Sequence, residues 1–299
     1  MRVGEVAVVG RPNAGKSTLV NAFVGEKVAI VSDKPQTTRK RILGVARRAG
    51  IEMALVDTPG IHRPQFRMNA EMVREATDAL ASADAILFVV DAAEPRGAGD
   101  AHIGELALKA GAPVVLAVNK IDLMKKNALL PLLAALGAQS PYKDFREIVP
   151  ISAHSGESVE HLFEVLAKLL PEGDAAYPDD FLTATPQTEW IGEVIREKLL
   201  ERTRDELPFA HAVVIESVRP GEGKDITVVT ASIVVEREGQ KGIIVGKGGA
   251  MIRDIGKAAR EELERELGRK FYLELTVRVQ PDWRNDERFL SRLRGSETR

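Results

Sequence analysis

The sequence contains no cysteine, no long apolar run and little net charge. Zero Cys among 299 residues excludes disulfides and thiolate metal sites. No stretch reaches the roughly 18 apolar residues of a membrane span. An apolar strand pattern begins at the N-terminus, so we expect no signal peptide. With 44% apolar residues, the chain has enough material for ordinary globular cores, and its length predicts two domains.

The net charge of -2 gives no general sign of a nucleic-acid partner. Residues 1–180 contain 21 basic and 23 acidic side chains, and residues 181–299 contain 21 of each. Because neither half is basic overall, any nucleic-acid site has to rest on a local patch.

Four short motifs follow one another in the first half of the chain. They are residues 10–17 (GRPNAGKS), 57–60 (DTPG), 119–122 (NKID) and 152–153 (SA). The first matches G-x-x-x-x-G-K-[ST], a loop whose backbone N–H groups surround phosphates at a helix N-terminus. Alone it indicates a nucleoside triphosphate, whereas the third motif names guanine as the base.

The same half alternates apolar strands with helices. Motifs placed just past the carboxyl ends of such strands lie where open α/β sheets bind ligands. Continuous apolar strands predict a mostly parallel sheet with helices on both faces, which is the α/β fold of a P-loop domain. The expected strands are residues 5–9, 52–56, 85–90, 113–118 and 147–151.

The first two motifs supply the phosphate and metal chemistry. Lys16 brings a positive charge to the phosphates, and the Ser17 hydroxyl offers a ligand to Mg²⁺. We expect Asp57 to hold Mg²⁺ through water and the Gly60 N–H to meet the γ-phosphate. The polar segment 33–39 should be a loop that orders around the γ-phosphate, with Thr38 as a further Mg²⁺ ligand.

The last two motifs supply base recognition. The Asp122 carboxylate can accept from the guanine ring N–H and its exocyclic amine together, a donor pair that adenine lacks. We expect Asn119 to brace the loop, the Lys120 stem to cover the base, and the Ala153 N–H to reach the guanine carbonyl. The predicted GTP pocket comprises Gly10, Arg11, Pro12, Asn13, Ala14, Gly15, Lys16, Ser17, Thr18, Asp57, Thr58, Pro59, Gly60, Asn119, Lys120, Asp122, Ser152 and Ala153.

The pattern changes near residue 171. We expect a GTP-binding domain over residues 1–173, a linker over 174–185, a smaller α+β domain over 186–282 and a C-terminal tail over 283–299. The second domain shows an α-β-β-α-α-β order, which is that of a type II KH fold. Its expected elements are a helix at 188–207, strands at 209–218 and 226–236, the segment 242–249, a helix at 250–267 and a strand at 271–279.

The segment Gly246-Lys247-Gly248-Gly249 fits the G-x-x-G loop with which KH domains clamp a nucleic-acid backbone. Between residues 237 and 260 there are six basic and two acidic side chains, which is the local patch that the total charge lacks. The competing interpretation is a helix-turn-helix with a solvated charged face. The predicted RNA-binding residues are Lys241, Gly246, Lys247, Gly248, Gly249 and Arg253.

The residues of the first motif and the segment Thr37-Thr38-Arg39 resemble the corresponding motifs of the translation-factor-related GTPases. With the second half included, the chain resembles the Era family of GTPases over both domains. The resemblance implies GTP hydrolysis to GDP, and binding of the 30S ribosomal subunit near the 3′ end of 16S rRNA during its assembly. It also implies a cytoplasmic location with peripheral contact to the inner face of the cell membrane.

One residue departs from the Ras-type pattern, in which a Gln after Asp-x-x-Gly orients the attacking water. Ile61 stands at that place, as in Era-like GTPases, and it cannot hydrogen-bond water. Asn13 matches the family's cation-binding Asn, which implies K⁺ beside the phosphates. The alternative is that Asn13 only stabilises the loop. The residues expected to act in hydrolysis are Lys16, Thr38, Gly60 and Asn13.

Two alternatives remain open at this point. One is a GTP-regulated switch whose KH-like domain contacts protein instead of RNA. The other is an ATP-using P-loop enzyme, which Asp122 disfavours. The five histidines show no ligand spacing, and we expect no role for His62 in catalysis.

Overall fold

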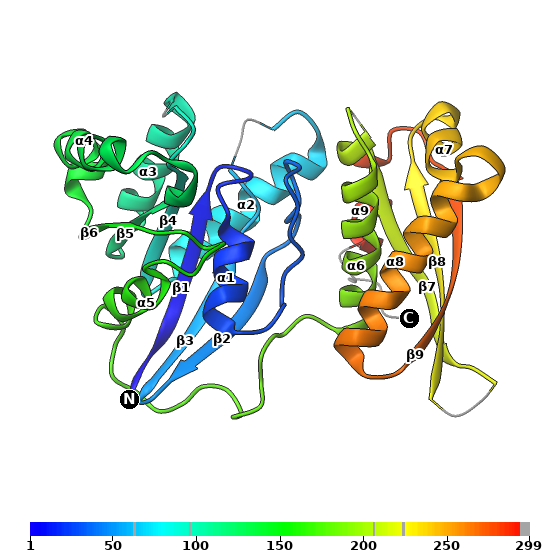
Figure 1. Cartoon of the computed structure of the whole chain (residues 1–299), viewed down its shortest axis with the longest axis horizontal. Coiled ribbons are helices and arrows are strands. Elements are labelled where there is room, and N and C mark those ends of the chain that lie inside the picture. Colours follow the sequence, from blue (N-terminus) through cyan, green and yellow to red (C-terminus); the bar gives the residue numbers. More distant parts are fainter. Residues whose placement is uncertain (62–63, 96, 206, 223–224, 294–299) are drawn as a thin grey trace. The chain divides into compact units, whose positions relative to one another are not determined.

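The computed structural model describes residues 1–61, 64–95, 97–205, 207–222 and 225–293. The chain divides into two compact units (Figure 1). The first unit contains residues 1–65 and 69–184, and the second contains residues 66–68 and 185–299. Within the described ranges, no helix combines the length and the hydropathy that crossing a membrane requires.

The first unit is built on a six-stranded sheet with the order β2-β3-β1-β4-β5-β6. All neighbouring strands are parallel except β2 and β3. The predicted mostly parallel sheet is therefore confirmed. Its strands are β1 (Arg2–Gly10), β2 (Ile42–Arg48), β3 (Ile51–Asp57), β4 (Ala85–Asp91), β5 (Val114–Asn119) and β6 (Glu147–Pro150).

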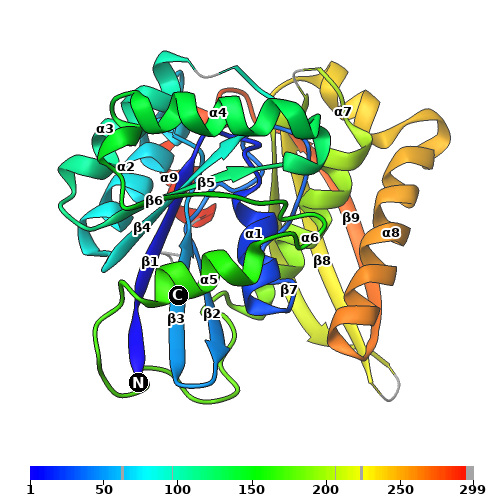
Figure 2. The same ribbon diagram turned by 60° about the vertical axis from the view of Figure 1, so that its left-hand side comes forward.

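Helices cover both faces of this sheet (Figure 2). On one face lie α1 (Lys16–Val24) and α5 (Val159–Ala167), whose Phe23 and Phe163 rings meet edge to face at 5.6 Å. The other face is covered by α2 (Arg67–Ser82), α3 (Ala98–Lys109) and α4 (Lys126–Ala138). Strands that are buried on both faces explain the continuous apolar runs of the sequence.

Strand β2 was not predicted from the sequence. It pairs antiparallel with β3 from Ile42 opposite Asp57 to Arg48 opposite Ile51. The hairpin turns at Gly50, whose φ of 73° suits glycine. Because β2 is an edge strand that ends in two arginines, it lacks the uniform apolar character of the central strands.

The predicted linker is bound along this edge strand. The Val45 N–H donates to the Leu182 carbonyl at 2.8 Å. Arg47 forms an ion pair with the buried carboxylate of Glu52 at 3.0 Å, and Glu52 Oε1 also accepts from the Ala176 N–H at 2.6 Å. These contacts place all of the linker up to residue 184 in the first unit.

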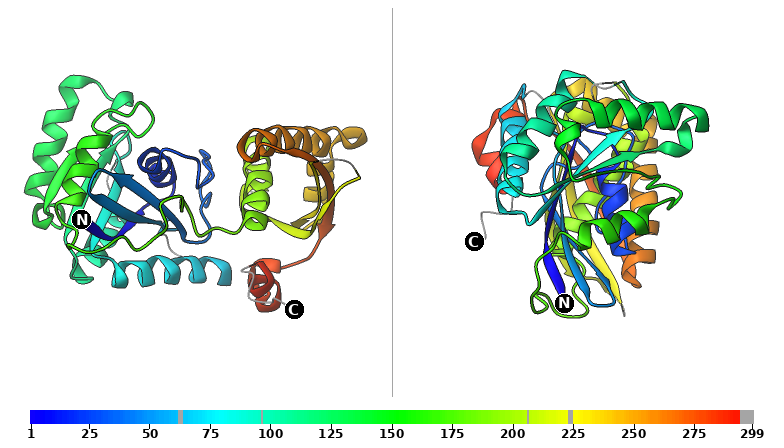
Figure 3. Two further views of the ribbon diagram at one scale, coloured as in Figure 1. Left: turned by 90° about the horizontal axis from the view of Figure 1, so that it is seen from below. Right: turned by 90° about the vertical axis from the view of Figure 1, so that its left-hand side faces the viewer.

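The second unit has a three-stranded sheet with the order β7-β8-β9, in which β7 and β8 are antiparallel and β8 and β9 parallel. The helices α6 and α8 pack against this sheet around a second core (Figure 3). The predicted α-β-β-α-α-β order is confirmed. The elements are α6 (Gln187–Arg202), β7 (His211–Pro220), β8 (Ile226–Val235), α7 (Glu238–Val245), α8 (Ala250–Leu267) and β9 (Lys270–Val279).

One expected boundary in this unit was wrong. Helix α6 ends at Arg202 and not at 207, because the backbone of Thr203 is extended, with φ −108° and ψ 153°. The Thr203 hydroxyl donates to the Leu199 carbonyl at 2.7 Å at this helix end. The segment expected to be the C-terminal tail contains a 3₁₀ turn (Trp283–Asn285) and a further helix. Trp283 is fully buried, donates to the Ala210 carbonyl at 3.2 Å and precedes helix α9 (Glu287–Leu293).

Candidate functional site

The first motif forms the loop between β1 and α1. Gly10 has φ 154° and Gly15 has φ 93°, so the chain curls through conformations that glycine adopts most easily. The Lys16 ammonium folds back over the loop, 3.3 Å from the Gly10 carbonyl and 3.2 Å from that of Arg11. The loop thus combines the geometry and the positive charge of a phosphate site.

Two glycines are required because the motifs pack directly against one another. A Cβ atom on Gly15 would lie 2.2 Å from Asn119 Nδ2, and one on Gly60 would lie 2.6 Å from the Pro12 nitrogen. Neither position can accept a side chain unless the neighbouring motif moves.

Asn119 holds three motifs together. Its Nδ2 donates to the Ala14 carbonyl at 2.8 Å, and its Oδ1 accepts from the Ala153 N–H at 2.9 Å. The side chain therefore braces the loop in the way that we expected from the sequence. The Ala153 N–H is already engaged, so a contact with a guanine carbonyl would have to share that hydrogen.

The three residues predicted as metal ligands meet at one point. The Ser17 hydroxyl donates to Asp57 Oδ2 at 2.6 Å and lies 2.8 Å from Thr38 Oγ1, which is itself 3.2 Å from Asp57 Oδ2. Among the described residues, Asp57 Oδ1 is a buried oxygen with no hydrogen-bond partner. Hard oxygen ligands with one unsatisfied carboxylate oxygen fit a Mg²⁺ ion.

Burial has the largest effect on the pKa values of Lys16 and Asp57 at this site. It lowers the pKa of Lys16, against the raising effect of the Asp57 charge. Burial also raises the pKa of Asp57, against the lowering effects of Lys16, Ser17 and Thr38. Desolvation thus outweighs the attraction between the two groups. Such a pair suits a ligand that carries both signs of charge, as a metal-bound phosphate does.

The second motif is fixed to the sheet. Thr58 is buried and its hydroxyl donates to the Val8 carbonyl at 2.8 Å, so that hydroxyl serves the fold and not the predicted pocket. Ile61 is only 6% exposed and packs in the core with Val9 and Val56. Its side chain faces the core, which agrees with its inability to orient water. Residues 62–63, including His62, lie outside the described residues.

The third motif forms a short turn after β5. Lys120 has φ 66°, a left-handed conformation that is uncommon for a residue with a side chain. A 3₁₀ turn (Ile121–Leu123) follows, and it leaves the Asp122 side chain exposed. In the fourth motif, the buried Ser152 hydroxyl accepts from the Ser155 N–H at 3.1 Å and so shapes its loop.

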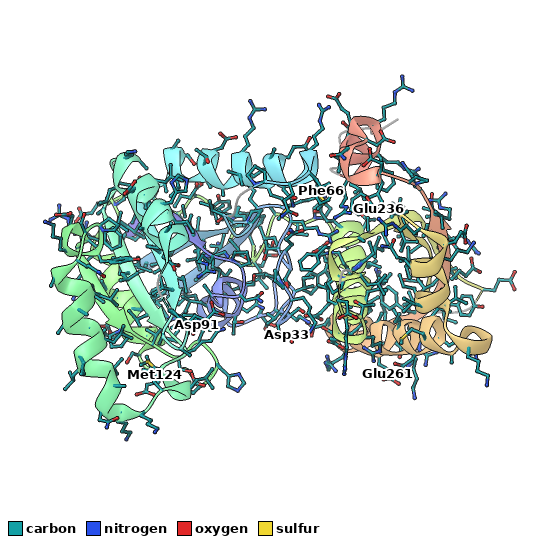
Figure 4. All side chains as sticks on the ribbon, turned by 90° about the horizontal axis from the view of Figure 1, so that it is seen from above. Asp33, Phe66, Asp91, Met124, Glu236 and Glu261 are labelled. Carbon is teal, nitrogen blue, oxygen red and sulfur yellow. The ribbon has the colours of Figure 1, made fainter. Side chains whose placement is uncertain are left out.

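Two loop residues are turned toward protein groups. Arg11 Nη1 lies 3.4 Å from Asp100 Oδ2 and 3.9 Å from a Glu94 oxygen, so its guanidinium faces the start of α3. Asn13 Nδ2 donates to the Asp33 carbonyl at 2.6 Å, which links this loop to the segment that carries Thr38. Asp33 is marked in Figure 4.

The predicted RNA loop lies between α7 and α8. Gly246, Gly248 and Gly249 have φ values of 70°, 57° and 77°, and Lys247 is exposed between them. Arg253 Nη1 donates to the Gly248 carbonyl at 2.7 Å, so this predicted RNA ligand braces the loop.

Two residues of α7 flank this loop. Lys241 is half-buried, and Ile243 is 53% exposed. An exposed isoleucine beside a glycine loop offers an apolar surface next to the predicted backbone clamp.

Sequence reasoning missed two acidic residues beside the nucleotide motifs. Asp100 is buried and binds Arg11, while Asp91 ends β4 and binds Lys120. The only sequence signal was the position of Asp91 directly after an apolar strand, at the sheet edge where ligands bind.

Comparison with known proteins agrees with this architecture. Residues 5–120 match the family described as 50S ribosome-binding GTPase, and residues 206–284 match the KH domain family. GTPase Era from Geobacter metallireducens is 48% identical over 292 residues, covering 98% of this chain and 97% of that protein.

Two solved structures are similar over their full length. An Era variant from Aquifex aeolicus bound to GDP and AlF₄⁻ has a TM-score of 0.94 and 41% identity, with 100% of both chains covered. Era in complex with MgGDPNP and nucleotides 1506–1542 of 16S ribosomal RNA has a TM-score of 0.95 and the same identity and coverage.

The fold and the site define a P-loop GTPase domain followed by a KH domain. The chain belongs to the Era family of GTPases.

Proposed function

We propose that this protein binds GTP with Mg²⁺, hydrolyses it to GDP, and binds 16S rRNA through its KH domain during assembly of the small ribosomal subunit. The observation that carries the proposal is the meeting of Ser17, Thr38 and Asp57 oxygens beside the phosphate loop. These residues come from three separate segments, and a structural role alone does not require an unpaired carboxylate oxygen there.

Mg²⁺ at this point would neutralise charge on the β- and γ-phosphates. Ser17, Thr38 and Asp57 would hold it, and Lys16 would bind the same phosphates. Hydrolysis breaks the bond between the γ-phosphorus and the bridging oxygen as water attacks, giving GDP and phosphate. Because Ile61 faces the core, the water has to be positioned by backbone groups, by another residue or by a bound cation, and the Gly60 N–H is the backbone group assigned to the γ-phosphate.

K⁺ is a second candidate cation in this proposal. Asn13 uses its amide nitrogen to hold Asp33, and that orientation leaves the amide oxygen as the group able to face a cation. Turnover should then be faster in K⁺ than in Na⁺ at equal ionic strength. Asn13→Gly keeps the left-handed backbone but removes the amide, so it should abolish this difference. Equal rates in both salts for the parent protein would rule out the K⁺ role.

Guanine selectivity is assigned to Asp122, with Asn119 and Lys120 shaping the turn that presents it. Asp122→Asn replaces an acceptor by a group that can donate, so affinity should move from guanine to xanthine nucleotides. Two charge-assisted hydrogen bonds are lost, each worth roughly 1.5–3 kcal/mol. Asp144→Asn is the matched control, because Asp144 is also exposed in a 3₁₀ turn of the same unit. Unchanged GTP affinity in Asp122→Asn would refute the assignment.

RNA binding is assigned to the loop from Gly246 to Gly249. Its three glycines with positive φ let a nucleic-acid backbone approach closely, and Lys247 adds a positive charge. The relative crystallised with nucleotides 1506–1542 of 16S rRNA supports the ribosomal 3′ region as the ligand.

The test is a double variant with a matched control at the other end of α8. Lys247→Asp with Gly248→Asp should collapse affinity for a 16S 3′-tail oligonucleotide, while GTP affinity stays near that of the parent. Arg265→Asp with Gly268→Asp makes the same charge change. Gly248 and Gly268 have φ 57° and 65° and open space around a Cβ atom. Equal RNA affinities for both doubles would contradict the assignment and favour a protein ligand.

A cytoplasmic location with peripheral contact to the inner membrane face completes the proposal. Its support is the family membership alone. Sedimentation of the protein with vesicles of phosphatidylglycerol would test it, and a protein that stays in the supernatant at low salt would contradict the contact.

A further inference from the structure

Asp91 lies where the fourth strand meets the third nucleotide motif (labelled in Figure 4). It is the last residue of β4, and the parallel register places it beside Asn119. The next residue, Ala92, donates its N–H to the Asn119 carbonyl at 2.7 Å. The end of β4 is therefore locked to the start of the turn that carries Asp122.

Both carboxylate oxygens of Asp91 are used. Oδ1 accepts from the Ala93 N–H at 2.9 Å, and Oδ2 lies 2.6 Å from Lys120 Nζ. The side chains of Asp91 and Lys120 are 11% and 30% exposed, so water is largely excluded from the carboxylate and partly excluded from the lysine. An ion pair with little solvent access fixes its partner more strongly than a surface pair does.

Lys120 determines how the following turn begins. Its backbone is left-handed, which is uncommon for lysine, and its carbonyl accepts from the Leu123 N–H at 3.0 Å to close the 3₁₀ turn. Asp122 is exposed in this turn and is held there by the backbone. A shift of the Lys120 backbone would therefore move the turn that carries Asp122.

We propose that Asp91 is a positioning residue for base recognition: it holds Lys120 and, through Lys120, aims the Asp122 carboxylate at the guanine edge. This inference rests on the proposed GTP site. Asp91 itself touches no nucleotide. It acts on selectivity and on affinity for the nucleoside, and the phosphate and metal groups are held by other segments.

Hypoxanthine nucleotides test whether the Asp122 carboxylate is placed to bind both guanine donors, because hypoxanthine keeps the ring N–H of guanine and lacks the exocyclic amine. A well-aimed carboxylate prefers GDP over IDP, since it pairs with two donors instead of one. Asp91→Asn preserves the shape and the bond from Ala93 but removes the charge that holds Lys120. We expect Kd for GDP and for GTP to rise equally, roughly tenfold, the size of one charge-assisted hydrogen bond. The preference for GDP over IDP should shrink, while Mg²⁺ dependence and turnover at saturating GTP stay unchanged.

The experiment titrates the full chain and its variants with GDP, GTP and IDP by calorimetry. Asp84→Asn is the matched control. Asp84 directly precedes the same strand and accepts from the Glu5 N–H at 2.8 Å, at the end of the strand away from the motifs. It should keep the parent's preference for GDP over IDP. Asp91→Glu keeps the charge and should retain more of that preference than Asp91→Asn does.

Three results would overturn the inference. They are a full GDP preference in Asp91→Asn, the same loss in Asp84→Asn, and equal losses in Asp91→Glu and Asp91→Asn. A parent protein that binds IDP as tightly as GDP would instead contradict the proposed guanine site itself, so the two failures are distinguishable.

Discussion

Gly15→Ala tests whether the motifs form one packed unit. Gly15 begins α1 with φ 93°, and a Cβ atom there would lie 2.2 Å from Asn119 Nδ2. Gly25 ends the same helix with φ 82° and has nothing within 4 Å of its Cβ position. The two substitutions to Ala therefore share the backbone strain, and the collision with Asn119 is what should separate their effects on stability.

The structure sets the expected magnitudes. A non-glycine residue in a left-handed conformation costs about 1–2 kcal/mol, which is the whole effect expected for Gly25→Ala. Gly15→Ala adds an overpacking cost of about 1–3 kcal/mol. Displacing the Asn119 amide also breaks its bond to the buried Ala14 carbonyl, at a cost of about 1–3 kcal/mol. The total of about 3–8 kcal/mol is a large share of the stability of a typical domain, about 5–15 kcal/mol.

Urea unfolding followed by far-UV circular dichroism measures this difference in the nucleotide-free proteins. Both tryptophans, Trp190 and Trp283, belong to the second unit, so their fluorescence provides an internal reference that neither change should move. GDP affinity should fall in Gly15→Ala and stay close to the parent value in Gly25→Ala. Equal losses of stability and of affinity in the two variants would refute the packed arrangement.

Three further predictions concern single side chains. Thr38→Ala should weaken Mg²⁺·GTP and spare GDP in calorimetric titrations, since Thr38 serves the γ-phosphate state, and equal weakening would disprove that role. Ile61→Gln should not supply a water-orienting group, because the side chain is buried; burying the amide should cost about 1–3 kcal/mol in a thermal melt. A faster turnover at unchanged stability would contradict it. The Lys270 ammonium, 3.0 Å away, lowers the pKa of Glu264 below that of an ordinary glutamate. Its stabilising effect is therefore present above the ordinary pKa and lost as the pH falls through the lowered one. Glu264→Gln should lose less Tm between about pH 6 and pH 3 than the parent does, and identical slopes would count against the pairing.

The central strands and the motif positions were predictable because burial on both faces leaves a simple signal. An apolar run that ends in Asp57 or Asn119 predicts a buried strand, and it also predicts that the ligand residues lie at the carboxyl end of that strand. Ser17 and Asp57 were predicted as metal ligands because they belong to these motifs, and Thr38 because it lies in the polar segment expected to order around the γ-phosphate.

The features that could not be predicted from the sequence depend on contacts between segments that are distant along the chain. Strand β2 exists because β3 and the linker pair with it, and its own composition is mixed. Arg11 and Arg253 were predicted as ligand residues from their place in or beside the motifs alone, and nothing in the sequence indicated their contacts with Asp100 and the Gly248 carbonyl. Charge in a sequence does not reveal whether its partner is a ligand or another part of the chain.

The linker bound along β2 decides where the first unit can be cut. A fragment ending at residue 173 would uncover a sheet edge, whose free backbone groups recruit strands from other molecules. It would also leave the Glu52 carboxylate without the Ala176 N–H and open to solvent. A fragment ending at residue 184 keeps both protections. Residues 174–184 look dispensable in the sequence, but they cover the sheet edge and should therefore prevent self-association of the isolated GTPase domain.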